Sequence, residues 1–183
     1  MRTVLTALGV IMLLAVSGCN KPEDAVATLP PVSVPEAPAA SAGGACILWD
    51  WKFIQEKIGV KFSVAASDQV DDTSTCVVQT VNGSWPDLSL SVVEQTKADA
   101  KIFLASRVPA KSVKLKGLGK AGYRLTTAAT GGHGPSVEIG WLSEAEQLQT
   151  LRFTFAKGAS NSAVSQMNTK LLALAKAMDT TDG

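Results

Sequence analysis

The single histidine of the chain, His133, is the first candidate for catalysis, because imidazole can take up or release a proton near neutral pH. It lies in the Gly-rich segment 130–135, whose composition predicts a solvated turn. Hydrolysis by a nucleophile needs a serine or cysteine held against such a base, and the sequence contains no Gly-x-Ser-x-Gly elbow. We therefore expect no catalytic residue and a solvated loop position for His133.

Two further groups of residues have types that suit ligand binding. Asp68, Asp71 and Asp72 are close in sequence, but they lack the order of acids and the final glutamate of an EF-hand loop. Gly117 and Gly119 follow an expected strand, yet no third glycine and no following helix complete a dinucleotide site. The sequence predicts a solvated acidic loop and a structural turn, with no metal and no cofactor.

The first nineteen residues have the features of an export signal. Arg2 supplies a positive charge, and residues 4–16 are apolar or small. The Val-Ser-Gly-Cys segment that ends at Cys19 resembles the lipobox of bacterial lipoproteins, in which the cysteine thiol is acylated and becomes the new N-terminus. The uncharged stretch is shorter than the roughly 20 residues of a transmembrane helix. We expect a lipoprotein signal peptide over 1–18 and lipidation of Cys19.

This N-terminus also predicts where the protein resides. Two or more acyl chains, such as palmitate, hold a protein stably on a bilayer. The expected location is the extracytoplasmic face of the cell membrane, or of the outer membrane in a host that has one.

Cys46 and Cys76 are the two cysteines that remain once Cys19 carries lipid. An even number of cysteines in an oxidising compartment indicates a disulfide. Neither lies in the Cys-x-x-Cys pair of many reactive thiols, and with His133 they have no grouped spacing for zinc. A bond between them closes a loop of about 30 residues, which the chain-entropy model values at about 3.5 kcal/mol. We expect a Cys46–Cys76 disulfide.

The charge of the chain without its signal is balanced. Removal of the signal takes Arg2 from the 17 basic residues and leaves 16 against 16 acidic ones. Balanced and scattered charge argues against nucleic acid as a partner and against a strongly basic membrane-facing patch.

Residues 19–45 contain five of the eight prolines, so that segment is either a semi-rigid spacer that lifts a domain off the bilayer or disordered filler. Residues 46–180 are expected to form a single domain.

Hydrophobic periodicity predicts the elements of this domain. Helical patterns cover 46–59, 96–107 and 160–178, and in the second Thr96 with Asp99 resembles a capping box. Alternation typical of half-buried strands occurs at 76–81, 88–92, 113–115, 123–125, 137–141 and 151–155. The order αββαββββα predicts an α+β fold, an antiparallel β-sheet with helices on one face. The likeliest buried positions on the sheet are all apolar, which leaves no evident in-facing acid: Val113, Leu115, Val137, Ile139, Leu151 and Phe153.

Aromatic residues near the first helix leave two interpretations open. Trp51 belongs to the apolar face of that helix, while Trp49 and Phe53 lie four residues apart on an adjacent face. These two either widen the core contact or line an apolar groove for a ligand or partner. Trp85, beside Pro86, is expected near a hairpin and could plug its turn.

The chain resembles an actinobacterial lipoprotein domain family of unknown function. The resemblance rests on the element order, on Cys46-Ile47-Leu48 opening a helix that ends at Gly59, on Cys76 in the next strand, and on the segment 115–121. Members of that family resemble PsbP-like sandwiches and the extracytoplasmic sensor domains of some receptor kinases. The resemblance covers about 46–180 and implies an α+β sandwich, a disulfide and an envelope role, with no catalytic residues to transfer.

Two classes of function follow from these observations. The first is a lipid-anchored, non-catalytic envelope module that binds an apolar small molecule, a lipid or an envelope protein. The second is an envelope enzyme with an unrecognised active site. The absence of a clustered nucleophile, base or carboxylate pair in the sequence favours the first class.

Overall fold

The computed structural model describes residues 37–94 and 97–179, which belong to one compact unit. The expected signal peptide, Cys19 and the spacer up to residue 36 lie outside these residues. The elements of the described unit are, in chain order, the 3₁₀ helices η1 (Ala39–Ala42) and η2 (Gly44–Leu48), α1 (Trp51–Ile58), β1 (Val64–Val70), β2 (Thr73–Thr80), β3 (Gly83–Val93), α2 (Ala100–Ser106), β4 (Val113–Leu115), β5 (Ala121–Thr127), β6 (Ser136–Leu142), β7 (Leu148–Thr154) and α3 (Asn161–Asp179).

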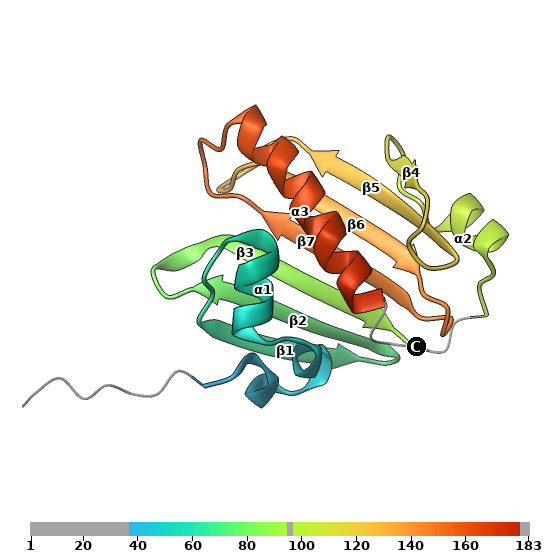
Figure 1. Cartoon of the computed structure of the whole chain (residues 1–183), viewed down its shortest axis with the longest axis horizontal. Helices are drawn as coiled ribbons and strands as arrows, with labels where there is room; N and C mark the ends of the chain where they lie inside the picture. Colours follow the sequence, from blue (N-terminus) through green and yellow to red (C-terminus); the bar gives the residue numbers. More distant parts are fainter. Residues whose placement is uncertain (1–36, 95–96, 180–183) are drawn as a thin grey trace, which may run out of the picture. The chain divides into compact units, whose positions relative to one another are not determined.

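The seven strands form one antiparallel sheet in the order β1-β2-β3-β7-β6-β5-β4 (Figure 1). Strands β1 to β3 and strands β4 to β7 are two antiparallel groups that meet where β3 pairs with β7. The α+β fold class predicted from the sequence is therefore confirmed. The sheet has one strand more than expected, because 64–70 is a strand as well.

Helices α1 and α3 lie together on one face of the sheet (Figure 1). The apolar residues of α3 point at this face at intervals of three and four, which makes its buried stripe. They pack on alternate residues of β6 and β7, of which Ile139, Trp141 and Leu151 are fully buried. The predicted α3 stripe is confirmed at all five positions: Val164, Met167, Leu171, Leu174 and Met178.

Two aspartates fix where the shorter helices begin. The Asp50 side chain accepts a hydrogen bond from the Phe53 amide at 2.9 Å, so α1 begins at Trp51 rather than at Cys46. Its end at Gly59, in the left-handed conformation with φ 75°, agrees with the sequence. Asp99 likewise accepts from the Ile102 amide at 2.7 Å and is itself the N-cap of α2. The expected cap, Thr96, lies outside the described residues.

The packed domain starts on the N-terminal side of the expected boundary at residue 46. Ala39 and Ala45 are buried in the main core, and the Trp51 indole donates a hydrogen bond to the carbonyl oxygen of Ala37 at 2.8 Å. Both 3₁₀ helices contact the edge strand β1. Residues 37–45, which the composition assigns to the spacer, therefore belong to the fold.

The second face of the sheet is covered at one end by α2. Phe103 of α2 stacks on Tyr123 of β5, with ring centroids 6.1 Å apart. The expectation that Val113 is buried is wrong: it is 54% exposed, because it lies on the edge strand β4, which is only three residues long. Among the described residues, no helix is long and apolar enough to cross a membrane.

Candidate functional site

A buried carboxylate lies on the sheet face opposite α3. Glu138 of β6 is 5% exposed, and one of its oxygens accepts a hydrogen bond from the Tyr123 hydroxyl at 2.7 Å. Its other oxygen accepts from Nε of Arg152 at 2.8 Å and also from the terminal guanidinium nitrogen. The expectation of no in-facing acid is therefore wrong, because strand register places Arg152 directly opposite Glu138 and so provides a partner for the charge.

Tyr123 is held over a glycine of the neighbouring strand. Burial, followed by the hydrogen bond to Glu138, raises the pKa of Tyr123 above its ordinary range. The phenol therefore stays protonated and donates to the carboxylate. A Cβ at Gly140, the cross-strand partner of Tyr123, would clash with the Tyr123 ring. Tyr123 thus occupies space that any other residue at 140 would need.

The same face continues toward His133. The carboxyl of Asp87 accepts hydrogen bonds from Thr154, while burial raises its pKa above the ordinary value, an effect opposed by these bonds and by the nearby His133. His133 is half-buried rather than solvated, because its ring packs against Trp85 with centroids 4.9 Å apart. Its Nδ1 lies 2.6 Å from the carbonyl oxygen of Gly134. Trp85 of β3 therefore packs against His133.

These residues form a polar row across the second face: Asp87, Tyr123, His133, Glu138, Arg152 and Thr154. Both oxygens of Glu138 are occupied by protein donors, and the pKa of the Tyr123 phenol lies too high for a base at neutral pH. The buried Glu138 carboxylate is therefore satisfied by its protein donors, of which the Arg152 side chain is 54% exposed. Apart from His133, which lies in the loop before β6, the sequence shows the members of the row only as polar residues at alternate strand positions, so strand pairing is needed to find them.

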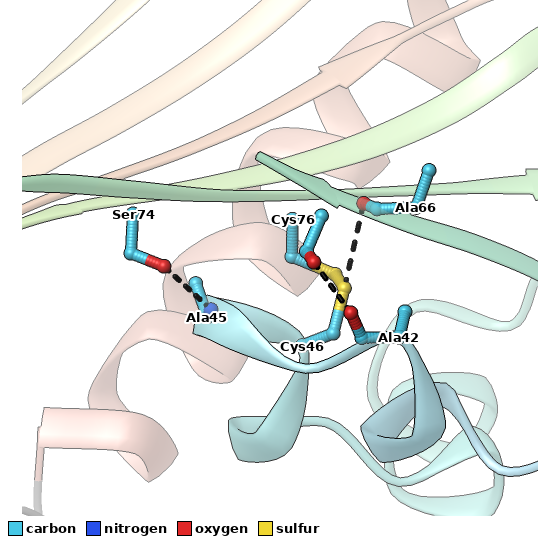
Figure 2. Close-up of a disulfide and its surroundings, with 7 residues drawn as sticks. Ala42, Ala45, Cys46, Ala66, Ser74 and Cys76 are labelled. Atoms are coloured by element: carbon cyan, nitrogen blue, oxygen red, sulfur yellow. Dashed lines mark hydrogen bonds between the residues drawn. A yellow bond between two sulfur atoms is a disulfide. The ribbon is translucent and has the colours of Figure 1, made fainter. Parts of the chain in front are cut away.

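A different part of the fold is built around the disulfide. Cys46 of η2 and Cys76 of β2 are bonded, with Cα atoms 4.9 Å apart (Figure 2). Next to the bond, the Ala45 amide donates to Oγ of Ser74 at 2.8 Å. A Cβ at Gly44 would lie 2.9 Å from the same oxygen, at φ +52°, so this position requires glycine. The predicted pairing of these cysteines is present, and it clamps η2 onto the sheet.

An open hollow of about 310 Å³ lies beside this clamp, and we call it the η2 groove. It is lined by Gly44, Ala45, Ile47, Leu48, Gln69, Asp71, Asp72, Ser74, Val92, Glu94 and Gln147. Ile47 is 66% and Leu48 is 41% exposed, so two large apolar side chains face solvent at its wall. Among these lining residues three are acidic and none is basic. The groove therefore combines apolar surface with negative charge.

The remaining predicted positions are distributed over the fold. Asp71 and Asp72 form the β1–β2 turn and line the η2 groove, whereas Asp68 belongs to β1. Gly119 lies in the β4–β5 turn, where its amide donates to Asp179 at 2.9 Å. The described residues contain no group of three or more His, Cys, Asp or Glu that could hold a metal ion.

The aromatic residues near α1 do not line the groove. Trp49 is 2% exposed and belongs to the core, and Phe53 is half-buried against that core. The sequence draws attention to these aromatics because of their size. Of the residues that do line the groove, Leu48 has the helical spacing of Trp51, Ile54 and Ile58 and is expected on their apolar face, but it is 41% exposed because α1 begins only at Trp51.

Comparison with protein families, with curated proteins and with solved structures finds no match for this chain. The geometry of the η2 groove and of the polar row is therefore the evidence from which a function is inferred. The groove is open and partly apolar, while the carboxylate of the row is already engaged by protein donors.

Proposed function

We propose that the protein is a lipid-anchored, non-catalytic envelope module of the lipoprotein family that it resembles, and that it binds its partner in the η2 groove. The observation that carries this proposal is the exposure of Ile47 and Leu48 on a segment that the Cys46–Cys76 bond fixes in place. A rigid segment loses little conformational freedom when a partner binds to it.

The partner presents an apolar group, whether it is a small molecule, a lipid or an envelope protein. The volume of about 310 Å³ lies at the small end of the range for ligand pockets, so the groove accommodates one ring system or a short chain. Asp71, Asp72 and Glu94 favour a positive charge next to that apolar group. The alternative, an envelope enzyme, would have to use the polar row, whose carboxylate already has protein donors on both oxygens.

Binding in the groove is tested with Nile red, an uncharged apolar dye whose fluorescence rises in apolar surroundings. Ile47→Ser is expected to weaken dye binding about tenfold, because it removes most of the apolar side chain that the dye would cover. The matched control is Val81→Ser, since Val81 is also exposed, at 74%, but lies in the β2–β3 turn. Equal dye affinity in both variants and the wild type would contradict the proposed site.

The anchor is tested separately at Cys19. Cys19→Ser is expected to move the protein from the membrane fraction to a soluble, unacylated form, because the thiol that carries the lipid is absent. Fractionation and the intact mass of the purified protein measure this. A variant that stays on the membrane through an intact N-terminus would show that the apolar run is a transmembrane helix instead.

A further inference from the structure

The basic residues of the chain are unevenly distributed. Between Glu94 and Glu138 the sequence contains eight lysines and arginines but a single acidic residue, Asp99. The Asp99 carboxylate caps α2. A balanced total charge therefore conceals a segment with an excess of seven positive charges, and this segment forms α2, β4 and β5.

The fold gathers many of these charges at one edge of the sheet. Strand β4 is the edge strand, and we define the basic edge as Lys111, Val113, Lys114, Leu115, Lys116 and Arg124. Cross-strand pairing puts Lys114 on the face of Tyr123 and places Val113 with Arg124 on the other face. Positive charge therefore surrounds the strand on both sides, with exposed Val113 between the charged groups.

Hollows flank the basic edge on both sides. One of about 410 Å³ lies against α3, and Lys111, Val113 and Arg124 contribute to its wall. The other, of about 370 Å³, is lined by Leu104 of α2, by Lys114, Leu115 and Lys116, and by residues 117–121 of the β4–β5 turn and the start of β5. Each hollow thus offers apolar surface beside cationic side chains.

Two acidic residues lie beside the neighbouring β4–β5 turn. Glu146 lies 3.0 Å from Lys120, and Asp179 accepts from the Gly119 amide and the Trp141 indole. We therefore exclude Lys120 from the basic edge.

We propose that the basic edge docks on an anionic phospholipid surface. Phosphate groups complement the lysines and the arginine, and Val113 with Leu115 supplies the apolar contact that headgroup-level binding requires. The surface of an anionic bilayer presents many phosphate groups side by side, so it can contact the cations on both sides of β4. This inference adds a second membrane contact to the proposed envelope location, on which it rests.

The length of chain between Cys19 and the described domain is compatible with this contact. Residues 20–36 lie between Cys19 and the described domain, and their extended length is at most about 60 Å. The domain begins beside β1, the edge opposite β4. Seven strands put these edges about 29 Å apart. The anchored chain can therefore reach around and lay the basic edge on the bilayer.

Lysines on an edge strand also discourage pairing with another chain. That role accounts for Lys114 but not for Lys111, Lys116 and Arg124, which lie outside β4. The experiment therefore records the oligomeric state of each variant, so that self-association is separated from loss of membrane binding.

The test uses residues 19–183 with Cys19→Ser, which contains the whole compact unit and lacks the lipid and the apolar run. A thermal melt first confirms that each protein is folded. Sedimentation with vesicles of equal parts phosphatidylglycerol and phosphatidylcholine measures binding. The wild type is expected to bind these vesicles, to bind pure phosphatidylcholine weakly, and to dissociate at high salt, because salt screens surface charges.

Lys114→Glu/Lys116→Glu is expected to reduce binding to the anionic vesicles about thirtyfold or more, given about 1 kcal/mol for each lysine near such a surface. Lys52→Glu/Lys157→Glu changes the net charge equally at exposed positions away from the basic edge, and it is expected to bind nearly as the wild type. Equal loss in both double variants, or wild-type binding to polyphosphate but not to vesicles, would overturn the proposal. Either result leaves acylation of Cys19 unaffected, so failure of the docking contact and failure of the anchor are distinguishable.

Discussion

Replacing Cys46 and Cys76 together by alanine should lower the free energy of unfolding by about 3.5 kcal/mol, the largest single effect expected in this protein. The bond spans 30 residues of sequence, and without it the unfolded chain gains the freedom of that loop. Both cysteines are fully buried, so the smaller side chains also lose some packing. Denaturant unfolding measures the change, and the melting temperature should fall by about 10 °C.

Reduction provides the control for this prediction. Treating the wild type with a reductant should lower its stability by a similar amount, whereas the same treatment should leave the double variant unchanged. Alkylation of both cysteines in the native, unreduced protein would show that the bond is absent from the mature domain and would contradict the prediction.

Arg152→Met is expected to destabilise the domain by about 3 kcal/mol, because it leaves the Glu138 carboxylate buried without its cation. This destabilisation lies at the lower end of the range for breaking a buried ion pair, since the Arg152 side chain is 54% exposed. The hydrogen bond from Tyr123 remains but supplies no charge. Urea unfolding of the variant measures the loss.

Two further variants test whether the unpaired charge of Glu138 causes the destabilisation. Glu138→Gln introduced into Arg152→Met should recover more than half of the loss, since the neutral amide is less costly to bury. Arg124→Met, on neighbouring β5, should change stability by less than about 0.5 kcal/mol. If the second substitution recovers nothing, lost packing of the arginine stem explains the effect instead of charge.

The sequence predicts the parts of this fold whose burial is one-sided and regular. The apolar stripe of α3 is visible because one face of the helix is packed and the other is not. In β6 the apolar residues that pack against α3 alternate with Ser136, Glu138 and Gly140, so the alternation is visible although both faces of β6 are buried. Strand β1 has no such pattern: it is an edge strand with mostly exposed residues, and its backbone pairing with β2 determines its conformation. A pattern of side chains cannot report a strand that is held chiefly by its main chain.

The candidate sites are harder to predict, for two reasons. Glu138 looks solvated from its alternate position in β6, and only the register with β7 shows that Arg152 lies opposite it. The η2 groove requires the disulfide to bring residues 44–48 beside the β1–β2 turn. The sequence identifies the cysteine pair, but the surface that the pair creates depends on distant segments.

The contact between Tyr123 and Gly140 implies a constraint on how this sequence can evolve. Because the ring fills the space above the glycine, a side chain at 140 is tolerated only after position 123 has become smaller. If position 140 changes first, its new side chain clashes with the ring of Tyr123. The two positions should therefore covary among descendants of this chain, with the change at 123 coming first along any viable mutational path.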